Sequence, residues 1–194
     1  MGGWKMFCHS ELMKKPGGAE HQLPRIWYHS TMLTADLTRL FVRELETFQR
    51  EVEMFPDDQS LWKTLPGVAN SAGNLGAHLA GNVQHFIGAI LGKSGYVRHR
   101  DHEFSRRAGT RAEIVADLQA AIDAAKTYLP ALTPADLERE YPESVGGVKM
   151  ATGLFLMHLA SHAAFHLGQA DYLRRTLLND ARTAGTLPLK PLEK

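Results

Sequence analysis

The stretch HLASHAAFHLGQADYLRR, residues 158–175, lies in the most apolar segment of the chain and carries histidines at intervals of four. The spacing of its apolar side chains predicts a helix from about residue 151 to residue 178. On a helical wheel, the histidines share one arc with seven apolar residues: Leu154, Phe155, Leu159, Phe165, Tyr172, Leu173 and Leu177. The opposite side carries Ala160, Asp171 and Arg174. The pattern predicts that His158, His162 and His166 point into the protein interior.

A divalent metal ion would explain why imidazoles lie on a face that should be buried. Burying one polar group without a partner costs roughly 1–3 kcal/mol, so three in line would weaken a core. A metal ion removes this cost because it binds one ring nitrogen of each histidine. His162 and His166 lie one turn apart and can converge on one ion. A third ligand must come from a facing helix, where spacing alone leaves His78 and His85 as alternatives.

The rest of the chain predicts three further amphipathic helices and no strand. Their expected ranges are residues 31–55, 72–92 and 111–129. The expected caps are Asn70 or Ser71 for the second helix, and Thr110 with Glu113 for the third. A short capped turn is expected at Thr133 and Pro134. Four amphipathic helices joined by loops predict an all-α protein, a four-helix bundle.

The predicted bundle covers residues 31–180. Residues 1–30 show no clear period and are expected to form a loosely ordered extension. Residues 181–194 are rich in proline and are expected to form an extended tail. His99 and His102 fall in a polar stretch between the second and third helices, which predicts a solvated loop.

The composition excludes several classes of protein to which the chain could otherwise belong. The formal charge is +1, and basic and acidic residues are interspersed, which argues against a nucleic-acid-binding protein. The single cysteine, Cys8, excludes a disulfide within the chain and favours a reducing, cytoplasmic location. The N-terminus has no apolar run of signal-peptide length, and the most apolar helix contains histidines, so no membrane association is expected.

Two sequence elements together resemble the DinB/YfiT-like superfamily. The predicted second helix, NLGAHLAGNVQHFIGAILG, contains the element His78, Leu79 and Ala80. The fourth helix contains the HxxxHxGQ element as His162, His166, Gly168 and Gln169. In that family the first histidine joins the other two in a metal site, so the resemblance implies the ligands His78, His162 and His166. It gives no ligand role to His158, and it implies a four-helix bundle that forms a homodimer.

The resemblance also implies an activity. Relatives of this kind transfer low-molecular-weight thiols, so a metal-dependent transferase acting on a small thiol and an electrophile is expected. The ion would be zinc or nickel, with iron as an alternative, since imidazole binds all three. A metal-dependent hydrolase and a non-catalytic, stress-related metal-binding protein are the alternatives. A hydrolase would need a carboxylate base beside the metal, and none falls on the predicted inward faces.

Overall fold

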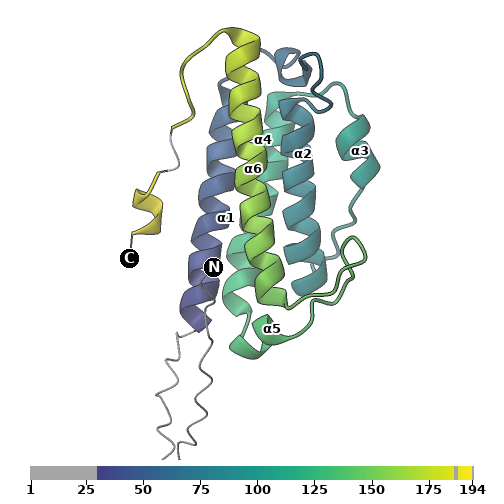
Figure 1. Ribbon diagram of the computed structural model, residues 1–194, viewed down its shortest axis with the longest axis vertical. Helices are drawn as coiled ribbons and strands as arrows, with labels where there is room; N and C mark the ends of the chain where they lie inside the picture. Colours follow the sequence, from purple (N-terminus) through teal and green to yellow (C-terminus); the bar gives the residue numbers. More distant parts are fainter. Residues whose placement is uncertain (1–29, 186–187, 194) are drawn as a thin grey trace, which may run out of the picture.

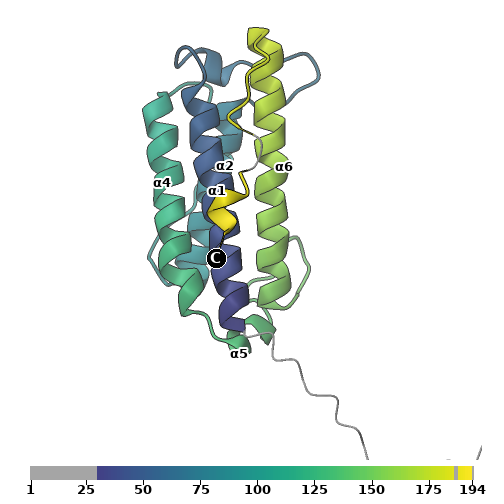
Figure 2. The same cartoon turned by 90° about the vertical axis from the view of Figure 1, so that its left-hand side faces the viewer.

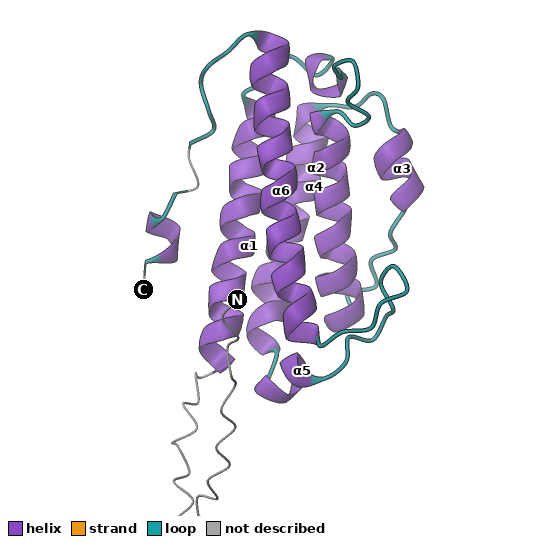
Figure 3. Cartoon of the chain, viewed as in Figure 1, coloured by secondary structure: helices purple, strands orange, loops and turns teal. Residues whose placement is uncertain are grey.

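The computed structural model describes residues 30–185 and 188–193, so the predicted extension at residues 1–30 lies outside the described residues except for Ser30. The described chain is helical and has no β-strand (Figure 3). Its four long helices are α1 (Ser30–Glu53), α2 (Ala72–Val83), α4 (Arg111–Tyr128) and α6 (Thr152–Leu178). The shorter elements are α3 (Arg100–Ser105), α5 (Pro134–Glu138), the π-helix η2 (Gln84–Leu91), and the 3-10 turns η1 (Ser60–Trp62), η3 (Leu129–Ala131) and η4 (Lys190–Leu192). The prediction of an all-α bundle is confirmed, and no described helix has the length and hydropathy needed to span a bilayer.

The four long helices form a closed bundle. Both α1 and α2 pack against α4 and α6 (Figure 1). In Figure 1, α1 and α6 run in one direction and α2 and α4 in the other. Because α2 and α4 are parallel, the connection between them must return along the bundle, and it carries α3 along the outer side of α2. The predicted solvated loop therefore contains a helix that packs on the bundle.

Capping residues fix where the helices begin. The Ser71 hydroxyl accepts from the Asn74 backbone N–H at 3.1 Å, and the Asn74 side chain accepts from the Ser71 backbone N–H at 3.2 Å. Of the two predicted caps for α2, Ser71 is the one used. Equivalent capping boxes start α4 and α5: Thr110 with Glu113, as predicted, and Thr133 with Asp136. Each box satisfies backbone N–H groups that have no partner within the helix.

The buried face of α6 differs from the predicted one. Its buried residues are Thr152, Gly153, Phe155, Leu156, Leu159, Ala163, Leu167, Ala170, Leu173 and Arg174. Leu154, Phe165 and Tyr172 were predicted inside but are 57%, 62% and 69% exposed. His158 is also exposed, and His162 and His166 are half-buried at the edge of the buried face. The buried arc is thus rotated by roughly a quarter turn, because alanines that carry little hydrophobic signal face the core.

A buried ion pair explains why an arginine lies on this interior face. Glu51 of α1 and Arg174 of α6 are both fully buried, and Arg174 Nε donates to the Glu51 carboxylate. Arg174 Nη2 also donates to the backbone oxygen of Arg182 at 2.6 Å. Burial raises the pKa of Glu51, although its bond to Arg174 opposes this shift. The pair joins α1, α6 and the segment that follows α6.

The segment after α6 returns along α1. Arg50 Nε donates to the backbone oxygen of Ala184 at 3.3 Å, and η4 packs against α1 (Figure 2). Apart from η4, the described part of residues 181–194 has no helix, and this part of the chain lies on the side of α1 rather than on α2.

Candidate metal centre

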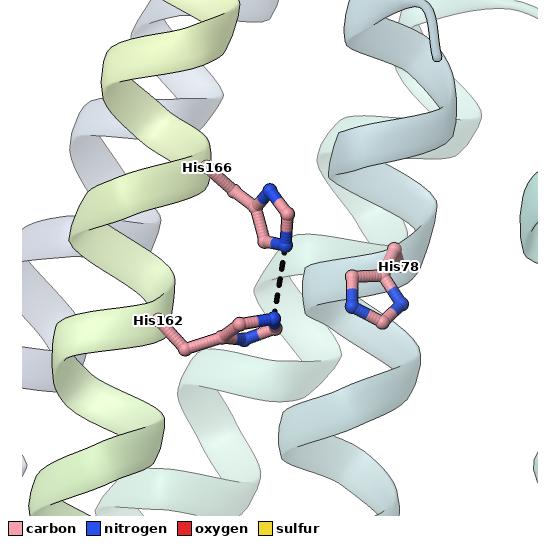
Figure 4. Close-up of side chains that lie close together, drawn as sticks. All are labelled: His78, His162 and His166. Carbon is pink, nitrogen blue, oxygen red and sulfur yellow. Dashed lines mark hydrogen bonds between the residues drawn. The ribbon is translucent and has the colours of Figure 1, made fainter. Parts of the chain in front are cut away.

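Three histidines from two facing helices lie together. His78 of α2 points toward His162 and His166 of α6 (Figure 4). The His78 ring centroid is 5.2 Å from each of the other two rings, and the His162 and His166 centroids are 4.3 Å apart. One nitrogen from each ring can be chosen so that all three lie within 4.8 Å of one another. Among the histidine, cysteine and acidic side chains of the described residues, these three histidines form the group whose geometry suits a metal ion.

The other candidate histidines lie outside this group. The His158 ring stacks on His162 with a centroid distance of 6.1 Å, and its side chain is exposed. His85 Nε2 lies 3.2 Å from a carboxylate oxygen of Glu143, in the segment before α6. His99 and His102 are exposed at and just inside the start of α3. Of the two α2-side alternatives left open by spacing, the structure thus brings His78, and not His85, to His162 and His166.

The hydrogen bonds of the rings orient their metal-binding nitrogens. His166 Nδ1 donates to Gln169 Oε1 at 2.7 Å, which leaves the lone pair on Nε2. That Nε2 faces His162 Nε2 at 2.9 Å. Two imidazole nitrogens facing each other at this distance need a proton or a cation between them. Since histidine ligands in metalloproteins usually donate their other N–H to a neighbouring acceptor, the arrangement fits a metal ion.

Glu103 of α3 orients the His78 ring through Nδ1, as Gln169 orients the His166 ring. Glu103 is 6% exposed, and its Oε2 lies 2.9 Å from His78 Nδ1. An ionised carboxylate can only accept, so Nδ1 donates to it and Nε2 is left free. Arg98 holds the carboxylate by donating from Nε to Oε1 and from Nη2 to Oε2, both at 2.7 Å. The Arg98 Nη2 to His78 Nδ1 distance is longer, 3.1 Å, so the carboxylate is the nearer partner of each.

Burial and charge set the protonation of Glu103. Burial opposes its ionisation, but the hydrogen bonds from Arg98 and His78 and the charge of Arg98 outweigh this effect and lower the pKa of Glu103. The group is therefore a carboxylate at neutral pH. A buried carboxylate bonded to a histidine is the arrangement that raises the basicity of a metal ligand.

Two residues of α2 hold α3 in place. Asn74 Nδ2 donates to the backbone oxygens of Glu103 at 2.9 Å and Arg106 at 2.8 Å, so it fastens the end of α3 to the start of α2. Gly81 lies directly under the Glu103 carboxylate, and a Cβ at this position would collide with Glu103 Oε1. The glycine therefore allows the carboxylate to reach His78 from the side of α2.

Both α6 histidines are neutral at physiological pH. Burial and the nearby charges of His166, His78 and His158 lower the pKa of His162 to about 4. Burial also lowers the pKa of His166, against the effect of its bond to Gln169. Neutral imidazole is the form that binds metal, so His162 and His166 need not lose a proton to bind an ion near pH 7.

Aromatic side chains flank the three histidines. The Phe104 ring of α3 lies 4.7 Å from the His78 ring, and the Phe165 ring lies 5.5 Å from the His166 ring. Phe104 is half-buried, whereas Phe165 is 62% exposed. The site is thus bordered by apolar surface, and it is open enough to leave His162 and His166 half-exposed.

The sequence pattern assigned no role to Glu103 or Arg98. No carboxylate was expected on the inward faces of the four predicted helices, and Glu103 instead reaches His78 from α3, in the connection between α2 and α4. Arg98 and Glu103 lie in the polar stretch between α2 and α4, five positions apart. The alternation of arginine, histidine and acidic residues from Arg98 to Glu103 is the one local signal of an ion pair there. It could not reveal that the pair packs on His78, because this depends on the path of the crossover.

Comparison with known sequences places these elements in one family. The sequence profile of the DinB superfamily matches residues 40–170. The matched range contains α2 to α5, most of α1 and α6, and the three clustered histidines. No curated protein matches the chain significantly. Because the match spans more than half of the 194 residues, the chain belongs to the DinB superfamily.

Proposed function

We propose that this protein is a metal-dependent enzyme in which His78, His162 and His166 bind one divalent ion and a low-molecular-weight thiol is transferred to an electrophile. The observation that carries the proposal is the convergence of three imidazoles from two facing helices, without a fourth protein ligand among the described residues. Catalytic sites typically use three protein ligands and leave a position for water or substrate, whereas structural sites are closed by four. Zinc and nickel are the first candidates, and iron is the alternative.

The ion would supply Lewis acidity, which stabilises a thiolate or hydroxide near neutral pH. The protein residues would perform the remaining tasks. His78, His162 and His166 hold the ion, and Glu103 and Gln169 fix two of the rings through their Nδ1 atoms. The half-buried, aromatic-flanked setting lowers the local dielectric, which strengthens the attraction between cation and thiolate.

The state of Glu103 favours a thiol over water as the activated group. Both of its oxygens accept hydrogen bonds from Arg98 or His78, and these bonds lower the pKa of Glu103, so it is a weak base for the proton of a nucleophile. No other carboxylate joins the three histidines in the described residues. A thiol with an ordinary pKa of about 8.5 needs less help to ionise than water does. Transfer from a thiol is therefore a better match to this site than hydrolysis.

A thiol panel with metal-loaded protein tests the proposal. Zinc- and nickel-loaded protein would be incubated with monochlorobimane and one of several thiols, such as N-acetylcysteine or glutathione, and the fluorescent conjugate measured. Turnover that requires the ion and disappears in His162→Ala supports the transferase. Metal binding without turnover with any thiol would contradict it and favour the non-catalytic alternative. Cleavage of 4-nitrophenyl acetate without thiol would favour the hydrolase.

We also propose that the protein is a homodimer in the cytoplasm. Support for association comes from four apolar side chains along one side of α6, which are between 47% and 69% exposed: Leu154, Met157, Phe165 and Tyr172. Exposed apolar stripes of this kind mark association surfaces. Sedimentation of the wild type and of Leu154→Glu tests the proposal, and a monomeric wild type at micromolar concentration would refute it. Cell fractionation tests the location.

A further inference from the structure

A cavity lies beside the start of α2 and reaches Gln169, the hydrogen-bond partner of His166. It has a volume of about 460 Å³ and lies between the 65–70 segment and α6. Its inner wall includes Leu75 of α2, three residues before His78. Gln169 of α6 also lines it, and the same side chain bonds His166 Nδ1 at 2.7 Å. None of the three histidines lines the cavity, and the Gln169 side chain connects it with the candidate metal centre.

The lining of this cavity contains no charged side chain. Ten residues line it, and the apolar ones include Leu65, Val68 and Leu173. Asn70 and Thr176 are among the few polar groups that could bond a ligand. An ionised ligand group would lose water here without meeting an opposite charge, which is unfavourable. The volume lies within the range of small-molecule sites, which are mainly apolar with a few polar groups.

We propose that this cavity binds the electrophilic co-substrate and selects an uncharged, mainly apolar molecule. The assignment rests on the proposed function, since it supplies the partner of the thiol at the adjacent centre. In the transfer, the thiol sulfur forms a bond to the electrophilic carbon, the bond to the leaving group breaks, the leaving group departs with the electron pair, and the thiol proton passes to solvent.

Binding of two unreactive probes tests the cavity without any turnover. 4-Nitrobenzyl alcohol is uncharged, whereas 4-(hydroxymethyl)benzoate has a similar size and carries one negative charge. Equilibrium dialysis with zinc-loaded protein should give at least about tenfold tighter binding of the uncharged probe. Equal binding of both probes, or tighter binding of the benzoate, would overturn the proposal.

A charge placed in the wall locates the binding site. Thr176→Lys should increase the affinity for the benzoate probe about tenfold relative to Thr176→Met, which has a side chain of comparable length without charge. Thr176 is exposed, so both variants should fold and bind zinc as the wild type does. If Thr176→Lys and Thr176→Met bind both probes alike, the probes bind elsewhere and the assignment fails.

Reactive chlorides that correspond to the two probes distinguish a failure of this proposal from a failure of the proposed function. 4-Nitrobenzyl chloride and 4-(chloromethyl)benzoate would be offered with a thiol, and chloride release measured. Selective binding of the uncharged alcohol without turnover of either chloride would show that the cavity binds uncharged molecules, and it would reject both thiol transfer and the role of the cavity as the co-substrate site. Turnover of both chlorides with equal KM would retain thiol transfer and reject the cavity assignment.

Discussion

Replacing Glu103 with glutamine should weaken metal binding without removing any metal ligand. The carboxylate accepts three short hydrogen bonds, two from Arg98 at 2.7 Å and one from His78 Nδ1 at 2.9 Å. A glutamine has one accepting oxygen and one donating NH₂ group in their place. If the NH₂ group faces His78, it needs the lone pair on Nδ1, which moves the ring proton to Nε2 and blocks the metal. If the NH₂ group faces Arg98, it meets the N–H groups of the guanidinium, so two hydrogen-bond donors face each other.

The size of the effect follows from these alternatives. Loss of an outer partner of a metal-binding histidine costs about 10- to 100-fold in affinity. This corresponds to about 1.4–2.7 kcal/mol of binding free energy. The side chain of Arg98, only 9% exposed, would also lose one charged partner, so some loss of folding stability is expected as well. Metal affinity and folding stability must therefore be measured on the same variant.

Zinc affinity can be measured by competition with a chromophoric chelator, and stability by circular dichroism on heating. Glu140→Gln is the matched control, because Glu140 is an exposed carboxylate that pairs with Lys149 away from the histidines. Gly81→Ala is a second test, since its methyl group would displace the Glu103 carboxylate without removing it. Wild-type zinc affinity in folded Glu103→Gln would refute the orienting role of Glu103.

Three further outcomes are expected. In the metal-free protein, the free energy of unfolding should fall as the pH drops from 6.5 to about 4, because the unfolded chain protonates at His162 before the folded one does. Urea denaturation at several pH values should show a flatter profile for His162→Gln, and an unchanged profile would contradict the assignment. Elemental analysis should find about one ion per chain in His85→Ala and little in His78→Ala; the reverse result would reassign the ligand on α2. Arg174→Ala should lose about 3–5 kcal/mol in urea denaturation, because the Glu51 carboxylate stays buried without its partner. Glu51→Gln added to that variant should restore part of the loss, and a loss below about 1 kcal/mol would contradict the importance of the pair.

The bundle was predictable because its signals are local. Apolar spacing and capping residues such as Thr110 predict helices from neighbouring positions alone, and α6 begins and ends where the pattern does. The trio of histidines was predictable for a different reason, since it came from the resemblance to a family. Spacing alone predicted that one α2 histidine faces α6 but could not choose between His78 and His85.

Features that depend on packing were missed. The face of α6 was misassigned because Phe165 and Tyr172 are strongly apolar yet exposed, whereas Arg174 is charged yet buried. A helical wheel weighs each side chain by its hydropathy and does not include a partner such as Glu51 on another helix. Glu103 was missed for a similar reason: its role exists only because the crossover brings α3 onto α2.

The π-helix η2 affects how this chain should be aligned with its relatives. A π-turn closes hydrogen bonds from i to i+5 and so holds one more residue than an α-turn. A relative whose second helix is α-helical throughout would align correctly only with a one-residue gap inside residues 84–91. Without that gap, every position between the extra residue and the helix end would be paired with the wrong neighbour. His78 precedes η2 and is unaffected, but a histidine aligned with His85 in such a relative need not be its structural equivalent.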